Sequence, residues 1–265
     1  MSIALNSAAS ALQIAKIKLD VIANDIANKN TTGYKAYDVR TSDLSYTSIV
    51  RPSPSTGEDS YTSQVQVGNG AKVTSTTRMM QQGALKNTDQ PLDMMIRGSG
   101  YFAIALPNGS KGYTRDGSFR ISNSMLVTKN GEKVLGEGEE IEIKPEFKLD
   151  SLEISQSGSM KIKNSDGEIV ELGKILVHRF NDEQAMEAVG NNVFRATEAS
   201  GDAEELVPGE QGAGLIEHKS LESSNVDTVK IVMDLMDAQN TYEIAFKIME
   251  ALNKIERKAN EIITV

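Results

Sequence analysis

Apolar residues recur at heptad spacing at both ends of the chain, and this pattern constrains the fold more than any other feature. Steps of three and four residues alternate, which is typical of helices that pack against other helices. We therefore expect one helix in the first thirty residues and another in the last forty. The stripe positions are Leu5, Ala8, Leu12, Ala15, Leu19, Ile22, Ile26, Ile231, Leu235, Ala238, Tyr242, Ala245, Met249, Leu252, Ala259 and Ile263.

A second apolar stripe runs beside the first on each predicted helix, through Ile14, Ile17 and Val21 and through Ile244, Ile248 and Ile255, among others. A helix that covers one core needs only one stripe. Pairing of the two terminal helices within one molecule explains the first stripe alone, whereas packing between copies of the chain uses both stripes. We predict assembly contacts at Leu5, Leu12, Leu19, Ile22, Ile26, Ile231, Leu235, Tyr242, Met249 and Leu252.

Polar residues and a glycine mark the ends of these helices. Asn28, Thr32 and their neighbours stop the first helix, and Gly33 is suited to a positive φ. Before the second helix, residues 223–225 (Ser-Ser-Asn) offer N-cap oxygens, and Asp227 suits the positive end of the helix dipole.

The middle of the chain is built differently. Residues 41–77 are dense in Ser, Thr and Gly, with prolines at 52 and 54, which predicts an extended arm or a long loop. From Leu92, short apolar runs are separated by Asx-Gly turns such as Asp116-Gly117 and Asn130-Gly131. They predict a small antiparallel β domain, closed or sandwich-like, and the chain is expected to loosen again over residues 181–214.

The predicted fold class is α+β, with long N- and C-terminal helices forming a coiled-coil-like unit and a mainly antiparallel β domain inserted between them. We expect three parts. Residues 1–30 and 225–265 form the terminal helical domain. Residues 31–91 and 200–224 form an extended arm and connecting β region, and residues 92–199 form the β-rich outer domain.

Composition excludes several functions. The net charge of −9 argues against binding to nucleic acid or to an anionic membrane surface. The absence of cysteine rules out disulfides and cysteine-based zinc sites. No apolar run approaches the roughly 20 residues of a transmembrane helix, and the N-terminus lacks the pattern of a cleavable signal peptide. We therefore expect a protein that is not membrane-inserted.

Candidate catalytic and cofactor motifs are weak. Residues 98–103 (Gly-Ser-Gly-Tyr-Phe-Ala) fit a dinucleotide-binding pattern, but a strand rather than a helix is predicted to follow, so the glycines indicate a bend between strands. His178 and His218 lack partners at metal-ligand spacing. We predict no catalytic, cofactor or metal site, and therefore no enzyme.

Both ends of the chain also resemble a known family. Residues 19–35 (LDVIANDIANKNTTGYK) resemble the N-terminal signature of flagellar axial proteins, the rod and hook subunits. Residues 223–227 (SSNVD) and 238–243 (AQNTYE) resemble their C-terminal signature, and residues 98–102 and 113–119 resemble their β-domain motif. The chain departs from the pattern at Asp25, Asn240 and Thr241. The matching motif residues are Asn24, Asn28, Thr32, Gly33, Tyr34, Lys35, Ser224, Asn225 and Val226.

The resemblance implies a structural subunit of the bacterial flagellar basal body. Such subunits leave through the flagellar type III export apparatus without a cleavable signal peptide and stack helically into a hollow, periplasm-spanning drive shaft that transmits torque. The implied partners are further copies of the chain, adjacent rod and hook proteins, and the bushing of the P- and L-rings, with no cofactor. The length and residues 44–52 resemble distal-rod members. A proximal-rod or hook-type subunit and a non-enzymatic β-domain binding module are the alternatives.

Overall fold

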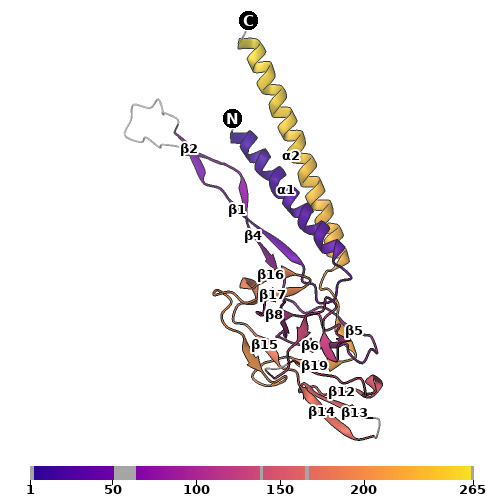
Figure 1. The fold of residues 1–265 in the computed structure, drawn as a ribbon. Helices are drawn as coiled ribbons and strands as arrows, with labels where there is room; N and C mark the ends of the chain where they lie inside the picture. The colour runs from indigo at the N-terminus through magenta and orange to yellow at the C-terminus, as the bar shows by residue number, and fades with distance from the viewer. Residues whose placement is uncertain (1–2, 51–63, 138–139, 165–166, 264–265) are drawn as a thin grey trace. The chain divides into compact units, whose positions relative to one another are not determined.

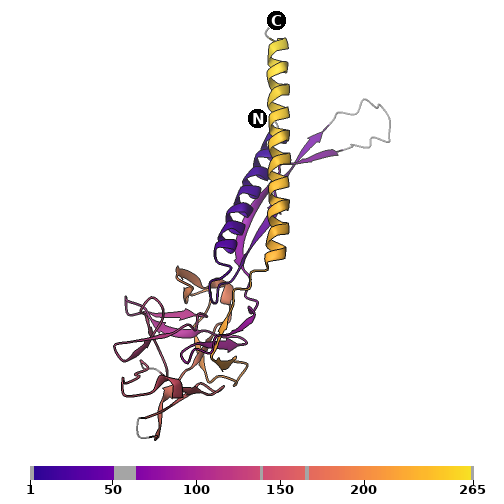
Figure 2. The same ribbon diagram turned by 90° about the vertical axis from the view of Figure 1, so that its right-hand side faces the viewer.

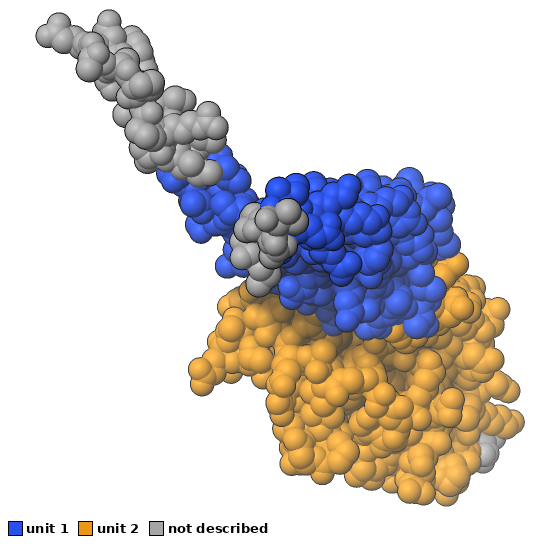
Figure 3. Space-filling view, turned by 90° about the horizontal axis from the view of Figure 1, so that it is seen from above, with its two compact units in different colours: residues 1–27, 37–77, 227–265 blue, residues 28–36, 78–226 orange. Residues whose placement is uncertain are grey.

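The computed structural model describes residues 3–50, 64–137, 140–164 and 167–263. It is an α+β protein, as predicted, with helices α1 (Ile3–Ala27) and α2 (Thr228–Ile263) at the two ends and mostly antiparallel strands between them. The proline-containing stretch 51–57 of the predicted arm lies outside the described residues. The chain forms two compact units (Figure 3). The helical unit comprises residues 1–27, 37–77 and 227–265, and the β unit comprises residues 28–36 and 78–226.

In the helical unit, α1 and α2 run antiparallel, side by side (Figures 1 and 2). Their buried apolar residues fall seven apart: Ala8, Ala15 and Ile22 on α1, and Ile231, Ala238 and Ala245 on α2. Because four of these six residues are alanine, the two backbones can approach closely, and the larger stripe residues lie toward the margins of the contact.

The start of α2 differs from the prediction. The carboxylate of Asp227 accepts the backbone N–H groups of Val229 (2.8 Å) and Lys230 (3.3 Å), so Asp227 is the N-cap. The cap predicted at residues 223–225 is wrong. The N-cap oxygen must reach the second or third N–H of the helix, and those three residues lie too far upstream of Thr228.

The arm of the helical unit consists of paired strands. β1 (Tyr37–Asp43) pairs with β4 (Ala71–Arg78), and β2 (Tyr46–Val50) pairs antiparallel with β3 (Gln64–Gly68). An extended arm or a long loop is predicted for residues 41–77, and the structure shows that the described part of this arm is made of paired strands. β-branched residues such as Val67, Val73 and Thr77 favour the observed pairing.

The β unit is organised around one antiparallel sheet. Its strands lie in the order β16-β17-β8-β7-β11-β10-β9. Their bounds are β7 (Phe102–Ala105), β8 (Lys111–Thr114), β9 (Arg120–Ser122), β10 (Met125–Val127), β11 (Lys133–Val134), β16 (Glu187–Gly190) and β17 (Val193–Arg195).

The β16–β17 hairpin lies in a segment that was predicted to be loose, and that prediction is wrong. The four residues of β16 are all exposed, so no apolar run marked the strand. Its turn is made by Gly190, Asn191 and Asn192, which all have positive φ (110°, 53° and 58°). Gly and Asn tolerate this conformation, which hairpin turns require.

Smaller sheets complete the β unit, together with short 3₁₀ helices at Leu149–Ser151 and Glu183–Ala185. Residues 141–143 are joined to the sheet by the isolated bridge between Glu142 and Met125. One large aliphatic core and a smaller cluster around Tyr101, Tyr113, Phe180 and Phe194 are buried. The paired strands are β12 (Glu153–Ile154), β13 (Ser159–Lys163) and β14 (Ile169–Lys174); β15 (Val177–Arg179) and β18 (Glu204–Leu206); β6 (Met94–Arg97) and β19 (Leu215–His218); and β5 (Leu85–Asn87) and β20 (Ser220–Glu222).

Candidate functional site

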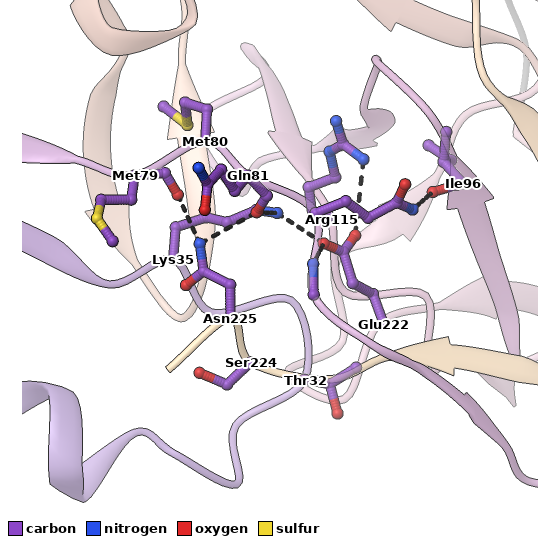
Figure 4. A network of polar contacts seen from close by, with 12 residues as sticks. Thr32, Lys35, Met79, Met80, Gln81, Ile96, Arg115, Glu222, Ser224 and Asn225 are labelled. Carbon is purple, nitrogen blue, oxygen red and sulfur yellow. Dashed lines mark hydrogen bonds and ion pairs between the residues drawn. The ribbon is translucent and has the colours of Figure 1, made fainter. Parts of the chain in front are cut away.

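Residues from both ends of the chain meet in the β unit, and we call residues 32–36 and 222–226 the junction (Figure 4). Backbone hydrogen bonds join its two segments: the N–H of Gly33 donates to the carbonyl of Glu222 (2.9 Å), and that of Asn225 donates to the carbonyl of Tyr34 (3.3 Å). The N–H of Met79 donates to Ala36 (2.8 Å). The junction therefore fixes the two places where the chain leaves the β unit.

A buried ion network lies at the centre of the junction. Lys35 Nζ is 2.6 Å from Glu222 Oε1, and Arg115 Nη1 is 3.6 Å from Glu222 Oε2. All three side chains are at most 4% exposed. Lys35 Nζ also donates to the carbonyl of Gln81 (2.9 Å), and the N–H of Gly83 donates to Glu222 Oε1 (2.9 Å). One carboxylate thus contacts two cations inside the protein.

The electrostatics indicate a structural network. Burial lowers the pKa of Lys35, because it disfavours the charged form, and attraction to Glu222 opposes this shift. Two of the three N–H donors of Lys35 Nζ are already used within the chain, on Glu222 and on the carbonyl of Gln81. A buried ion pair of this kind contributes little net stability when complete, but its disruption is costly because a charge is left unpaired.

The network continues into the aromatic cluster. The Arg115 guanidinium lies over the ring of Tyr101, 5.0 Å from its centroid, and donates to the carbonyl of Gly98 (2.8 Å). The Tyr101 hydroxyl donates to Glu183 Oε2 (3.1 Å). Burial raises the pKa of Tyr101, so this hydroxyl remains a proton donor.

Asn225 binds three backbone groups through its side chain. Its Nδ2 donates to the carbonyls of Met79 (2.7 Å) and Gln81 (3.0 Å), and its Oδ1 accepts the N–H of Ala36 (2.8 Å). Only an amide presents a donor pair and an acceptor in this arrangement, which explains the need for Asn at this position.

Gly33 is required by its backbone and by its surroundings. Its φ is +70°, as predicted, and a Cβ placed on it would lie 2.9 Å from the carbonyl carbon of Arg115. Next to it, the carbonyl of Thr32 accepts Asn192 Nδ2 from the β16–β17 turn (2.8 Å). We call residues 28–36, which follow α1, the strap. The strap therefore lies directly against the sheet.

The structure brings together most of the motif residues that the sequence indicated. Gly33, Tyr34 and Lys35 are buried in the junction, where Thr32, Ser224, Asn225 and Val226 are partly buried. Asn28 caps the turn after α1, accepting the Thr31 hydroxyl (3.2 Å), and Asn24 is exposed on α1.

Sequence reasoning missed Glu222 and Arg115 as members of this site. Arg115 lies inside the β-domain motif at residues 113–119, and Glu222 directly precedes the C-terminal motif. Their positions, within one motif and directly before another, are the signal in the sequence that could have indicated them. A charged residue is expected at the surface unless a buried partner is known.

The predicted assembly residues occupy different environments in the helical unit. Ile22 and Ile231 are buried, whereas Ile26 (47%) and Tyr242 (42%) are exposed. The remaining members are partly buried: Leu5, Leu12, Leu19, Leu235, Met249 and Leu252. Other large apolar side chains of α2 are exposed by about half or more: Val229, Val232, Met233, Met236, Ile244, Phe246, Ile248, Ile255 and Ile262.

The glycine-rich motif at residues 98–103 leads from a bend into β7. Residues 98–101 form a bend between β6 and β7, as predicted, and a Cβ on Gly100 would lie 2.0 Å from Val177 Cγ1. Within the described residues, no three His, Cys, Asp or Glu side chains are grouped in a way that could hold a metal ion. In the same part of the chain, no helix is both long enough and apolar enough to cross a membrane.

Known proteins match this chain along nearly all of its length. Family models match at residues 5–35 (flagella basal body rod protein), 95–162 (flagellar hook protein FlgE/F/G D1 domain) and 218–262 (flagellar basal body rod FlgEFG protein C-terminal). The flagellar basal-body rod protein FlgG of Borreliella burgdorferi is 36% identical over 98% of both chains. The FlgG proteins of Caulobacter vibrioides (35%, 98% of both chains) and of Buchnera aphidicola from Baizongia pistaciae (31%, 96% of this chain and 97% of the other) are also similar.

Terminal helices around an inserted β unit, together with the three matching family models, define the class of flagellar axial proteins. Within that class the chain belongs to the FlgG family of flagellar basal-body rod proteins, and it is a structural subunit of the rod.

Proposed function

We propose that the chain builds the distal rod by helical self-assembly, with its terminal helices packed as a coiled-coil-like unit against those of neighbouring copies. The uncovered apolar surface of α2 carries this proposal. Alanines fill the contact with α1, while Ile244, Phe246 and Ile248 remain 47–59% exposed. Burying one such side chain completely gains about 1.5–3 kcal/mol, so contacts between copies have a large driving force available.

The exposed apolar residues lie on both sides of the contact with α1. With 3.6 residues per turn, Ile244 and Ile248 fall on one flank of the buried row, and Val232 and Phe246 fall on the other. A helix pair with two apolar flanks contacts neighbours on two sides. Repeated contacts of this kind, which do not close on themselves, produce a filament.

The junction suits a subunit that carries mechanical load. Its hydrogen bonds and ion network tie both chain exits to the sheet of the β unit, so force on either exit is shared among many buried contacts. We propose that the polymer is the hollow, periplasm-spanning drive shaft that transmits torque from the motor to the hook.

The remaining assignments follow from family membership. We propose adjacent rod and hook proteins and the P- and L-ring bushing as partners, with export by the flagellar type III apparatus without a cleavable signal peptide.

We retain the three-part division into a terminal helical domain (1–30 and 225–265), an arm with a connecting β region (31–91 and 200–224) and a β-rich outer domain (92–199). The proximal-rod and hook-type alternatives differ only in the neighbours of the subunit.

Electron microscopy of the concentrated protein tests the self-assembly. A variant with Ile244→Asp and Ile248→Asp changes two exposed side chains and therefore keeps the fold, but it places charges on the apolar flank. We expect tubes from the wild type and none from this variant. The control, Asn240→Asp with Lys247→Gln, changes the net charge equally on the face opposite α1 and is expected to form tubes. Tubes from the Ile244/Ile248 variant would contradict the proposal.

A further inference from the structure

The C-terminal part of α2 projects beyond α1. From the last pair of buried alanines, α2 continues 18 residues from Ala245 to Ile263, whereas α1 continues only five, from Ala8 to its first described residue, Ile3. About 13 residues, or about 20 Å of helix, therefore extend past the described part of α1. Figures 1 and 2 show this projection, and we call residues 251–263 the overhang.

The overhang is amphipathic. Leu252, Ile255, Ala259 and Ile262 are spaced by three and four residues and share one face, and Ile255 and Ile262 are 63% and 78% exposed. By helical geometry, Lys254 and Lys258 flank this face on one side, and Glu256 flanks it on the other. These charged side chains are exposed as well.

A groove lies between α1, α2 and β1, near the opposite end of the helix pair. It encloses about 200 Å³, more than engineered cavities of about 150 Å³ that accept a benzene molecule. Val21, Val39 and Ala238 provide apolar lining. The charged residues of the groove are Asp234, Asp237 and Lys230 on α2, Asp38 on β1 and Lys18 on α1, so carboxylates outnumber lysines by three to two.

The overhang and the groove are complementary in shape and in charge. Branched side chains of Ile255 and Ile262 match the apolar lining. The lysines at 254 and 258 match the carboxylates of Asp234 and Asp237, which are three residues apart along one side of α2. Glu256, on the other flank, matches Lys18. The two surfaces lie at opposite ends of one helix pair, so they cannot meet within one molecule.

We propose that the overhang of one copy docks in the groove of the next, making a head-to-tail contact along the helix pair. This contact is heterologous and leaves a free groove at one end and a free overhang at the other, so it propagates without closing. The inference rests on the proposed self-assembly and names the surfaces that carry its axial step.

Charge reversal tests the pairing. The groove variant is Asp234→Lys with Asp237→Lys, and the overhang variant is Lys254→Glu with Lys258→Glu. Each places like charges together, so each is expected to raise the critical concentration for tubes at least about tenfold, which corresponds to about 1.4 kcal/mol. Lys247→Glu is the control, because Lys247 lies outside the overhang. It breaks the exposed salt bridge between Lys247 and Glu243, just as Lys254→Glu breaks the exposed salt bridge between Lys254 and Glu250.

Mixing the two variants provides the decisive result. In an equimolar mixture, every groove of one variant meets a complementary overhang of the other, so assembly is expected to return as an alternating copolymer. The fourfold variant is expected to assemble alone. If the groove variant or the overhang variant, tested on its own, assembles like the wild type, the docking is refuted although self-assembly stands. If neither the mixture nor the fourfold variant recovers, the charge pairing is refuted.

Cysteine crosslinking provides a test that does not require tubes. The chain contains no cysteine, so Thr241→Cys in the groove and Ala259→Cys on the overhang introduce two unique thiols. Mild oxidation is expected to produce a ladder of covalent oligomers. The control pair Thr241→Cys and Asn253→Cys places the second thiol off the apolar face and is expected to give at least about tenfold less product. Equal ladders, or none from the first pair, would overturn the proposal.

Discussion

Lys35 and Glu222 are 187 residues apart in the sequence, yet their side chains form a buried ion pair of 2.6 Å that joins the two ends of the chain inside the β unit. Arg115 shares the same carboxylate at 3.6 Å. Completing this network requires residues from the first forty and from the last forty-five positions of the chain. The β unit therefore reaches its final stability only when both ends are in place.

Replacing Glu222 is expected to be strongly destabilising. Glu222→Gln keeps the shape of the side chain but leaves Lys35 and Arg115 buried without a counterion, which costs about 3–5 kcal/mol in the free energy of unfolding. Urea denaturation measures the change. Glu187→Gln is the control, because the pair of Glu187 with Arg195 is roughly half-exposed, and it is expected to cost less than about 1 kcal/mol. Similar costs for the two substitutions would contradict the role of the network.

Gly33→Ala separates steric conflict from backbone strain. A positive φ costs a non-glycine residue about 1–2 kcal/mol, and at Gly33 the new Cβ also collides with the backbone of Arg115 and Asp116. Gly109→Ala has a similar φ of +81° but meets nothing within 4 Å. We expect Gly33→Ala to lower the denaturation midpoint more than Gly109→Ala does. Equal midpoints would show that the strap can move away from the sheet at no cost.

Replacing Asn225 and replacing Asp227 are expected to destabilise different parts of the protein. Asp227→Ala removes the N-cap, which costs about 0.5–2 kcal/mol and speeds amide hydrogen exchange in the first turn of α2. Asn225→Ala removes three hydrogen bonds to the backbone of Ala36, Met79 and Gln81, so exchange is expected to accelerate in the strap and in residues 79–83. Exchange confined to the first turn of α2 in both variants would contradict this separation.

His178 is expected to make stability depend on pH. It is 2% exposed, its Nδ1 has no hydrogen-bond partner among the described residues, and burial lowers its pKa, with the nearby Glu205 opposing the shift. The unfolded chain, whose histidine titrates near about 6.5, then binds more protons in acid. The contribution of His178 is therefore fully present above about pH 6.5 and is lost as the pH falls toward the lowered folded-state value.

His178→Phe tests this dependence, because a phenyl ring can pack against Tyr113 as the imidazole does and does not titrate. Between pH 7 and 5, the free energy of unfolding is expected to fall less steeply in the variant than in the wild type. Glu205 is the carboxylate that contacts His178, and its pKa is lowered, first by Lys111 and also by His178, so it titrates below this pH range. The difference in slope between pH 7 and 5 therefore belongs to His178. Parallel pH profiles would show that the histidine titrates alike in the folded and unfolded states.

The long helices were predictable because their signal is local. A heptad pattern depends only on residues three and four positions apart, and it located α1 and α2 correctly apart from a few residues at their ends. The Asx-Gly turns and the glycines at 33 and 100 could also be predicted from the sequence, since a positive φ or a tight bend restricts which residue can stand there. The β16–β17 hairpin could not be predicted, because its exposed first strand has no apolar pattern.

The sequence by itself therefore determined the helices, the antiparallel β region between them and, through its motifs, the family. Only the tertiary structure decided that Glu222 pairs with Lys35 and Arg115, that Asn225 binds backbone groups of two segments, and that alanines rather than leucines form the centre of the helix pair. The physical reason is distance along the chain. Partners nearly 190 residues apart leave no periodicity, and only folding determines which apolar face is covered and which remains free to bind.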